Sequence, residues 1–277
     1  MSARLRAIAR ETESVVAAGG YRTARGTEVS IGAAVERAVA GTRILGPEPV
    51  EPGAAPALTA PTAFEVTGED SLAAAGRLVH EGAAPVAVLN FASARNPGGG
   101  YVNGAQAQEE ALCRSSALYT TLLAARDFYA WHRADGSPFY SDRVVHSPGV
   151  PVFRDPRGKL LEEPFAVGFL TCAAPNAGVV ERQDPSAAVR LPAAIDARAG
   201  RVLEVAAAGG YRALVLGAWG CGVFRNDPAR VAAAFRGLLA PGGRFAERFD
   251  RVVFAVLDRQ RDAPTRAAFA TAFPSKE

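Results

Sequence analysis

Apolar residues along the chain alternate between short continuous runs and longer stretches with helical spacing. The continuous runs predict buried strands at 85–91, 165–173, 212–218 and 250–257, and shorter runs predict strands at 28–31, 63–67 and 143–146. Helical spacing predicts an opening helix that ends at Gly19-Gly20 and further helices at 33–40, 71–80, 106–125, 189–208, 228–239 and 264–272. This alternation is typical of an α/β layered domain whose sheet is largely covered.

One stretch interrupts the pattern. Residues 46–62 are rich in Pro and Ala and show no periodicity, so they predict a surface connection. We therefore divide a single globular domain, 1–277, into an N-terminal extension at 1–62 and a core at 63–277. The aromatic residues of 128–131 lie in a segment without a clear pattern, which we interpret as a loop whose side chains pack against the core.

The charge balance excludes a broad nucleic-acid surface. The chain has 31 Lys+Arg and 28 Asp+Glu, and its Arg residues are scattered instead of forming a stripe. The opening residues lack the apolar stretch of a signal peptide, and no window of 18 uninterrupted apolar residues predicts a membrane span. An abundance of Ala and Arg indicates a high-GC bacterium as the source.

Cysteine and histidine are scarce and widely spaced. The three Cys, at 113, 172 and 221, form no CxxC pair, so neither a disulfide framework nor a thiolate metal site is predicted, and a reducing cytoplasm is the expected compartment. The three His, at 80, 132 and 146, lack the spacing of metal ligands. We expect no metal and no cofactor.

The glycine excess is concentrated in two loops, each between a predicted strand and a predicted helix. Gly98, Gly99 and Gly100 follow the strand at 85–91. A second loop with Gly217, Gly220 and Gly222 follows the strand at 212–218, and its helix begins at Asp227-Pro228, a favourable N-cap and first-turn pair. Such loops bring backbone amides close to an anion, so two of them at one sheet edge predict a clamp on a diphosphate. Neither loop matches a P-loop or a clean GxGxxG fingerprint.

A pair of carboxylates opens the helix after the first loop. Gln108, Glu109 and Glu110 fit two interpretations: acidic residues stabilise a helix N-terminus, and carboxylates perform acid–base chemistry. Adjacent helical residues point about 100° apart, so the pair does not flank one bond as in an ordinary glycosidase, and one carboxylate must do most of the work. Burial and the neighbouring charge raise a carboxyl pKa, whereas helix-terminal amides lower it.

The spacing of the two motifs resembles a known family. Gly98 to Gly100, seven residues and then Gln108-Glu109-Glu110 resemble the GGG-x(6–8)-QEE signature of poly(ADP-ribose) glycohydrolases, in particular their compact bacterial branch. The segment GAWGCGVFRND resembles the second, diphosphate-binding loop of a macrodomain. The resemblance covers roughly residues 63–257 and implies a macrodomain-like three-layer α/β/α fold with a mixed central sheet and an N-terminal helical extension.

The resemblance also implies roles for individual residues. Glu110 would protonate the leaving ribose oxygen and then deprotonate the attacking water, and Glu109 would orient the ribose hydroxyls. Phe224 would pack against the sugar. The residues expected to bind substrate are Asn96, Gly98, Gly99, Gly100, Gln108, Gly217, Gly220, Cys221, Gly222, Val223, Phe224 and Asn226.

The implied activity is hydrolysis of the ribose–ribose O-glycosidic bonds of poly(ADP-ribose) on modified proteins, from chain ends, releasing ADP-ribose within a DNA damage response. Removal of the last protein-linked unit is not expected. Two alternatives remain open at this stage: a non-catalytic macrodomain that binds ADP-ribose termini, and a macrodomain hydrolase acting on mono-ADP-ribosyl proteins or O-acetyl-ADP-ribose. The pair Glu109 and Glu110 favours the polymer hydrolase, because a reader needs only the glycine loops.

Overall fold

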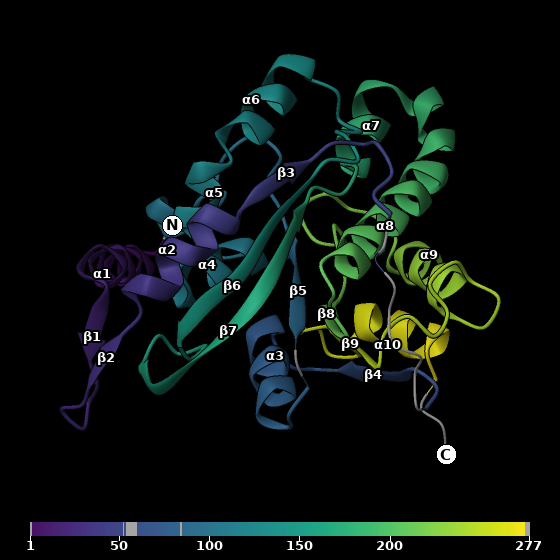
Figure 1. Cartoon of the computed structure of the whole chain (residues 1–277). Coiled ribbons are helices and arrows are strands. Elements are labelled where there is room, and N and C mark those ends of the chain that lie inside the picture. The colour runs from purple at the N-terminus through teal and green to yellow at the C-terminus, as the bar shows by residue number, and fades with distance from the viewer. Residues whose placement is uncertain (1, 52, 54–59, 84, 275–277) are drawn as a thin grey trace.

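The computed structural model describes residues 2–51, 53, 60–83 and 85–274, and it is built around one mixed β-sheet (Figure 1). In spatial order the seven strands are β3 (Arg43–Leu45), β6 (Val144–Arg154), β7 (Leu160–Cys172), β5 (Val86–Phe91), β8 (Ala213–Leu216), β9 (Arg251–Ala255) and β4 (Ala63–Thr67). β7, β5, β8, β9 and β4 run parallel, whereas β6 is antiparallel to both of its neighbours. The predicted mixed sheet is thereby confirmed.

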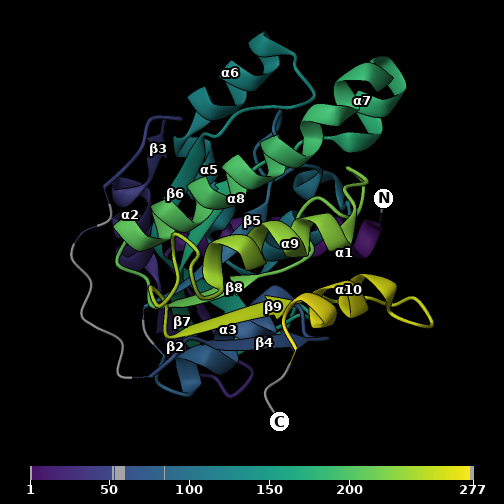
Figure 2. The ribbon, with the colours of Figure 1, turned by 90° about the vertical axis from the view of Figure 1, so that its right-hand side faces the viewer.

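Helices cover both faces of this sheet (Figures 1 and 2). One face carries α2 (Gly32–Gly41), α3 (Ser71–His80), α4 (Gln108–Ser115), α5 (Leu118–Ala124) and α6 (Arg126–Asp135). The other face carries α8 (Leu191–Ala208), α9 (Pro228–Leu239) and α10 (Pro264–Ala272). Alternate residues of β5 enter opposite cores: Val86 and Val88 pack on the first face, and Ala87 and Leu89 on the second. The continuous apolar runs reflect this double coverage, and the three-layer fold is confirmed.

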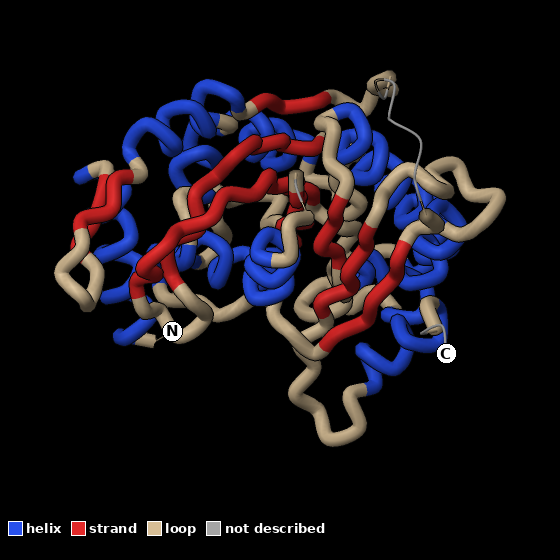
Figure 3. Tube along the Cα trace, turned by 60° about the horizontal axis from the view of Figure 1, so that its bottom comes forward, coloured by secondary structure: helices blue, strands red, loops and turns tan. Residues whose placement is uncertain are grey.

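The described residues before β4 contact the same body. α1 (Ala3–Ala18) ends at Gly19, in the left-handed region at φ 69°, and leads into a small hairpin of β1 (Gly20–Arg22) and β2 (Glu28–Ser30). In Figure 3, where strands are red, this hairpin lies apart from the main sheet. β3 of this region pairs with β6 and forms one edge of the main sheet. Of the predicted connection at 46–62, residues 52 and 54–59 lie outside the described residues.

Most predicted elements occur close to their expected bounds, and the differences have local causes. The helix predicted at 106–125 is two helices, because Ser116 is extended and its Oγ accepts the Leu118 amide, 3.2 Å away, at the start of α5. The segment with the aromatic residues of 128–131, interpreted as a loop, is helix α6, in which Phe128 and Tyr129 are fully buried.

Two strands, β6 and β7, are longer than predicted, and β7 begins at Leu160 instead of at residue 165. The strand expected at 143–146 extends to Arg154, although Pro148, Gly149 and Pro151 break the apolar pattern. A register shift between Ser147 and Val150 accommodates Pro148 and Gly149, whereas Pro151 pairs with Ala166 of β7. The sequence pattern did not predict β1, β3, α7 (Ala177–Gln183) or two short 3₁₀ helices, η1 (Tyr101–Asn103) and η2 (Pro185–Arg190). Among the described residues, no helix is long and apolar enough to cross a membrane.

Candidate active site

The first glycine loop leaves the carboxyl end of β5, at the middle of the sheet. Gly98 and Gly99 lie in the left-handed region, at φ 64° and 57°. The turn is closed by the Gly99 amide, which donates to the Asn96 carbonyl oxygen at 3.0 Å, and by the Tyr101 amide, which donates to the Gly98 carbonyl oxygen at 3.0 Å. These backbone angles favour glycine, so the loop conformation explains part of the predicted motif.

Gln108 fixes the start of α4 against β5. Its Oε1 accepts the Phe91 amide at 2.9 Å, and its Nε2 donates to the Leu89 carbonyl oxygen at 2.8 Å and to Ser71 Oγ at 3.1 Å. The family resemblance implied a substrate-binding role for Gln108. In the structure its amide is bonded to protein groups at both ends, which makes it a residue that positions the two glutamates following it.

Glu109 is almost completely buried, with 3% of its surface exposed. Its Oε2 accepts the Ser93 amide at 2.7 Å, and its Oε1 accepts Asn90 Nδ2 at 3.2 Å. Burial raises the pKa of Glu109 to about 8, against the opposing effect of the Ser93 and Asn90 hydrogen bonds, and the neighbouring Glu110 charge raises it further. At neutral pH this carboxyl is therefore mostly protonated.

The raised pKa predicts a stability difference between the parent and a Glu109→Gln variant. The folded protein binds this proton more tightly than the unfolded chain, so the stabilisation is complete below the ordinary value of 4.5 and is lost as pH rises through about 8. Between about pH 6 and 9 we expect the Tm of the parent to fall more than that of the variant, by about 3 °C or more. Thermal unfolding across this range measures the difference. Glu28→Gln, at an exposed hairpin position, is the control, and parallel curves for parent and Glu109→Gln would contradict the assignment.

Glu110 has a different environment. Its Oε1 accepts the Gly100 amide at 2.9 Å, whereas its Oε2 is buried and has no hydrogen-bond partner among the described residues. A Cβ atom added to Gly99 would lie 2.6 Å from Glu110 Oε1 and 3.1 Å from Glu109 Oε2. Both carboxylates therefore converge on Gly99, although their Cα positions are adjacent on the helix. Glu110 is the one with an oxygen free for chemistry.

The second glycine loop leaves the carboxyl end of β8, the strand beside β5. At Gly217 an added Cβ would lie 2.5 Å from the Ala255 carbonyl oxygen and 3.1 Å from the Phe91 ring, so the bases of the two loops are in close contact. Asn226 holds the far end of this loop, because its Nδ2 donates to the Pro175 carbonyl oxygen at 2.8 Å and to the Gly220 carbonyl oxygen at 3.1 Å. The loops thus lie side by side at one sheet edge, as the sequence predicted.

The amides of the second loop divide into two groups. Those of Cys221 and Asn226 donate to the carbonyl oxygens of Ala218 and Gly220 and shape the loop. Those of Gly217, Gly220, Gly222, Val223 and Phe224 have no acceptor within the described part of the chain. An anion would therefore bind at these amides, three of which are consecutive at 222–224, rather than at the Cys221 amide. Burial raises the pKa of the Cys221 thiol to about 12, so this thiol is no ready nucleophile.

Side chains at the rim differ in exposure. Val223 is 85% exposed, whereas Phe224 is half-buried with its ring centroid 5.8 Å from that of Tyr140. Asn96 is exposed, and its side chain makes no hydrogen bond to any described residue. These positions are consistent with contact to a ligand above the loops.

The histidines are engaged elsewhere. His132 Nδ1 lies 2.8 Å from the Phe128 carbonyl oxygen and its Nε2 lies 2.9 Å from Ser141 Oγ, and burial lowers its pKa to about 4. His146 pairs with the Tyr211 hydroxyl. Within the described ranges, no group of three or more His, Cys, Asp and Glu residues has a geometry that could hold a metal ion.

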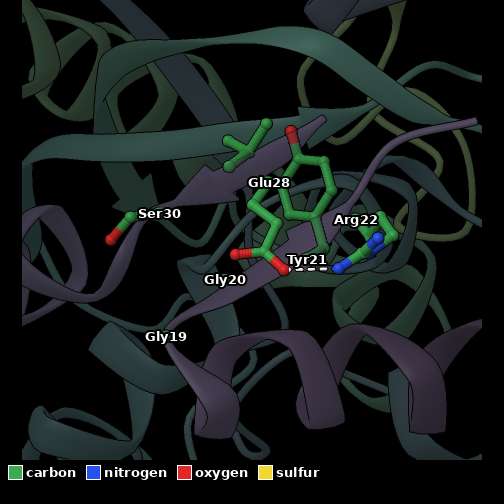
Figure 4. Close-up of a pocket in the computed structure, with 7 residues that line it drawn as sticks. Gly19, Gly20, Tyr21, Arg22, Glu28 and Ser30 are labelled. Atoms are coloured by element: carbon green, nitrogen blue, oxygen red, sulfur yellow. Dashed lines mark hydrogen bonds and ion pairs between the residues drawn. The ribbon is translucent and has the colours of Figure 1, made fainter. Parts of the chain in front are cut away.

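A hollow of about 430 Å³ lies away from this site, at the β1–β2 hairpin (Figure 4). It is lined by residues 19–22 and 28–30, including the exposed Arg22–Glu28 ion pair, and it contains none of the predicted site residues. It is a surface feature of the hairpin and not the centre built by the two loops.

Sequence reasoning missed the residues that support the carboxylates. Asn90 donates to Glu109 and, at 3.1 Å, to Thr171 Oγ1, and it is fully buried. Its signal in the sequence is a single polar residue within the otherwise apolar run 86–91. Ser93 acts through its backbone amide, and Tyr140 reaches Phe224 from a distant loop, so neither leaves a local pattern.

Comparison with known proteins gives consistent results. The family profile described as "Microbial-type PARG, catalytic domain" matches residues 9–155. The crystal structure of poly(ADP-ribose) glycohydrolase from Thermomonospora curvata shares 50% identity and a TM-score of 0.93, over 98% of this chain and 100% of that chain. Its complex with the inhibitor ADP-HPD shares 49% identity and a TM-score of 0.91 over the same shares. A search of the curated proteins gave no match.

A second bacterial enzyme is also similar. The poly(ADP-ribose) glycohydrolase from Deinococcus radiodurans, in complex with ADP-ribose, shares 45% identity and a TM-score of 0.79, over 87% of this chain and 97% of that chain.

Proposed function

The chain belongs to the microbial-type poly(ADP-ribose) glycohydrolases, and we propose that it performs the reaction of this family through Glu110. The enzyme is a glycosidase that acts on poly(ADP-ribose) and releases ADP-ribose. The assignment of Glu110 rests on its buried Oε2 beside the first glycine loop, an oxygen with no hydrogen-bond partner in the described part of the chain.

Binding begins at the diphosphate of the terminal ADP-ribose unit. The amides of Gly222, Val223 and Phe224, which have no described protein acceptor, hold this anion from one side, and the loop at 98–100 closes the other side. Neutral amides bind an anion without a basic surface, which accords with the small net charge of +3. The diphosphate lies away from the bond to be cut, so its binding energy serves to orient that bond.

Glu110 then performs both proton transfers. In the acid form of Glu110, Oε2 gives its proton to the leaving ribose oxygen as the glycosidic C–O bond breaks and positive charge develops on the sugar. The resulting carboxylate takes a proton from the attacking water, whose oxygen forms the new bond to the anomeric carbon. The proton returns to Glu110, so the enzyme is regenerated. The hydrogen bond from the Gly100 amide to Oε1 holds the carboxyl in place throughout.

Neighbouring side chains orient the sugar. Glu109, buried and mostly protonated at neutral pH, donates a hydrogen bond to a ribose hydroxyl, and Asn96 binds the same ribose from its exposed position. Phe224 packs on the sugar face, held in place by Tyr140. Gln108 contributes indirectly, by fixing the start of the helix.

The substrate is the chain end of poly(ADP-ribose) on modified proteins in the bacterial cytoplasm, within a DNA damage response. Free thiols at Cys113, Cys172 and Cys221 suit a reducing compartment. The small net charge supports binding of polymer ends in the site rather than along the polymer length. The division into an extension at 1–62 and a catalytic core at 63–277 is part of the same proposal, with the boundary in the connection at 46–62.

Product analysis tests this function. Purified protein is incubated with labelled poly(ADP-ribose), and the products are separated by length. We expect ADP-ribose to be the main product from the earliest times, because cleavage starts at chain ends. Short poly(ADP-ribose) oligomers among the earliest products would contradict cleavage from chain ends. Binding of ADP-ribose without any hydrolysis of the polymer would indicate a non-catalytic ADP-ribose-binding protein. A mono-ADP-ribosylated protein as substrate is the control, and we expect it to keep its modification.

A further inference from the structure

The catalytic loop has a second support on the side away from β5, formed by the N-terminal helix. α1 packs against η1, which directly follows the three glycines, and against α4, which carries the two glutamates. Figure 1 shows α1 beside α4, although about 90 residues of sequence separate them. This contact joins a segment outside the two motifs to the residues assigned to chemistry.

The contact is close at the backbone. The Ser2 amide donates to the Gly104 carbonyl oxygen at 3.1 Å. Gly104 lies in the left-handed region, at φ 74°, and an added Cβ there would lie 2.5 Å from the Ser2 carbonyl oxygen and 3.2 Å from the Arg6 amide nitrogen. Only glycine permits this approach, so the loop and the first turn of α1 are fitted to each other.

Tyr101 makes the central side-chain link. It directly follows Gly100, its side chain is fully buried, and its hydroxyl lies 2.9 Å from Glu13 Oε1 and 3.1 Å from the Ala9 carbonyl oxygen. Burial and the Glu13 charge raise the pKa of Tyr101, so the hydroxyl keeps its proton and is the donor. The tyrosine ring also contacts Tyr119, with centroids 4.9 Å apart.

A second link reaches the catalytic helix itself. Thr12 Oγ1 donates to the Arg114 carbonyl oxygen at 2.8 Å, and Arg114 Nη1 donates to the Ala105 carbonyl oxygen at 2.7 Å. The turn at 100–105 is thus bonded to α1 on one side and to α4 on the other. Because the Gly100 amide binds Glu110 Oε1, movement of this turn changes the position of the carboxyl.

We infer that α1 is a positioning element of the catalytic loop and that Glu13 and Tyr101 are its positioning residues. Neither residue touches substrate. They hold the turn after the glycines so that the Gly100 amide keeps Glu110 in the geometry for proton transfer. This inference rests on the proposed role of Glu110 and assigns a catalytic purpose to a segment that carries no family motif.

The test compares Tyr101→Phe, Glu13→Ala, Glu13→Gln and the double variant Tyr101→Phe/Glu13→Ala. Tyr101→Phe keeps the ring and removes only the donor, and we expect kcat to fall about tenfold with KM within about twofold of the parent. Glu13→Ala leaves the Ala9 acceptor, so a loss of about threefold is expected. Glu13→Gln retains an acceptor oxygen and restores kcat to within about twofold. The double variant is no slower than Tyr101→Phe, because both changes break one contact.

Tyr21→Phe is the matched control. Its hydroxyl also donates to a backbone carbonyl, that of Leu161 at 2.8 Å, but it lies on the hairpin and not on the loop. We expect a lower Tm with an unchanged kcat for this variant. If Tyr101→Phe behaves in the same way, or if the two single losses multiply in the double variant, the inference is wrong.

Amide hydrogen exchange gives a readout independent of hydrolysis. We expect exchange over residues 98–105 to be about tenfold faster in Tyr101→Phe than in the parent, and unchanged in Tyr21→Phe. If the parent releases no ADP-ribose, the proposed function fails, and exchange over 98–105 still decides whether α1 holds the loop. Unchanged exchange in Tyr101→Phe would overturn the inference whatever the activity.

Discussion

Replacing Glu110 by Gln is expected to lower the rate of ADP-ribose release by at least about 100-fold, the lower bound for loss of a general acid–base group. Glutamine has nearly the shape of glutamate, and its carbonyl oxygen can still accept the Gly100 amide at the position of Oε1. Its amide nitrogen then occupies the position of the buried Oε2, where it can neither give a proton to the ribose oxygen nor take one from water. The fold and the two loops stay unchanged.

Hydrolysis and binding must be measured separately for this variant. Release of ADP-ribose from labelled polymer gives kcat, and calorimetry with ADP-ribose gives the Kd, which we expect within about threefold of the parent because the loop amides are retained. Glu36→Gln, at an exposed position of α2, controls for the loss of one negative charge. A Glu110→Gln variant that cleaves within about tenfold of the parent would show that another group supplies the proton.

The layered fold was predictable because burial on both faces of the sheet leaves continuous apolar runs. β5 has this pattern, and its bounds were predicted to within one residue. β6 does not, because Pro148 and Pro151 lie inside the strand and only its pairing with β7 carries the chain past them. Such accommodation depends on a partner 15 or more residues away in the sequence, and no local pattern reports it.

For the site, the sequence was sufficient to predict where the two motifs lie. The spacing of Gly98–Gly100 and Gln108–Glu110 placed a loop and a helix start at one sheet edge, which the structure has. The difference between the two glutamates was not predictable from position alone. It arises because the Ser93 amide and Asn90 occupy both oxygens of Glu109, whereas Glu110 receives one bond from Gly100.

The N-terminal region illustrates the same limit. The sequence predicted a helix that ends at Gly19, and the structure has it. Nothing in that pattern indicated that its buried side would contact the turn after Gly100, because Glu13 and Tyr101 are 88 residues apart. Contacts between residues so far apart in the sequence can be identified only from the folded structure.

Replacing Gly99 by Ala is expected to lower ADP-ribose release by at least about 100-fold and, unlike Glu110→Gln, to weaken ADP-ribose binding as well. The added methyl group would lie 2.6 Å from Glu110 Oε1 and 3.1 Å from Glu109 Oε2, so both carboxylates must move. Displacement by about 1 Å is enough to disrupt proton transfer. The φ of 57° adds strain, because a side chain disfavours the left-handed region. The loop that binds the diphosphate shifts with it.

Gly82→Ala separates the clash from the backbone strain. Gly82 has a φ of 84°, no atom lies within 4 Å of its added Cβ, and it lies beyond the end of α3. Both variants therefore lose about 1–2 kcal/mol of stability from the left-handed backbone, but only Gly99→Ala displaces the carboxylates. Rates and ADP-ribose affinities are compared well below both Tm values. If the Gly99 variant hydrolyses polymer as fast as the Gly82 variant, the carboxylates tolerate the methyl group, and their convergence on Gly99 is not required for catalysis.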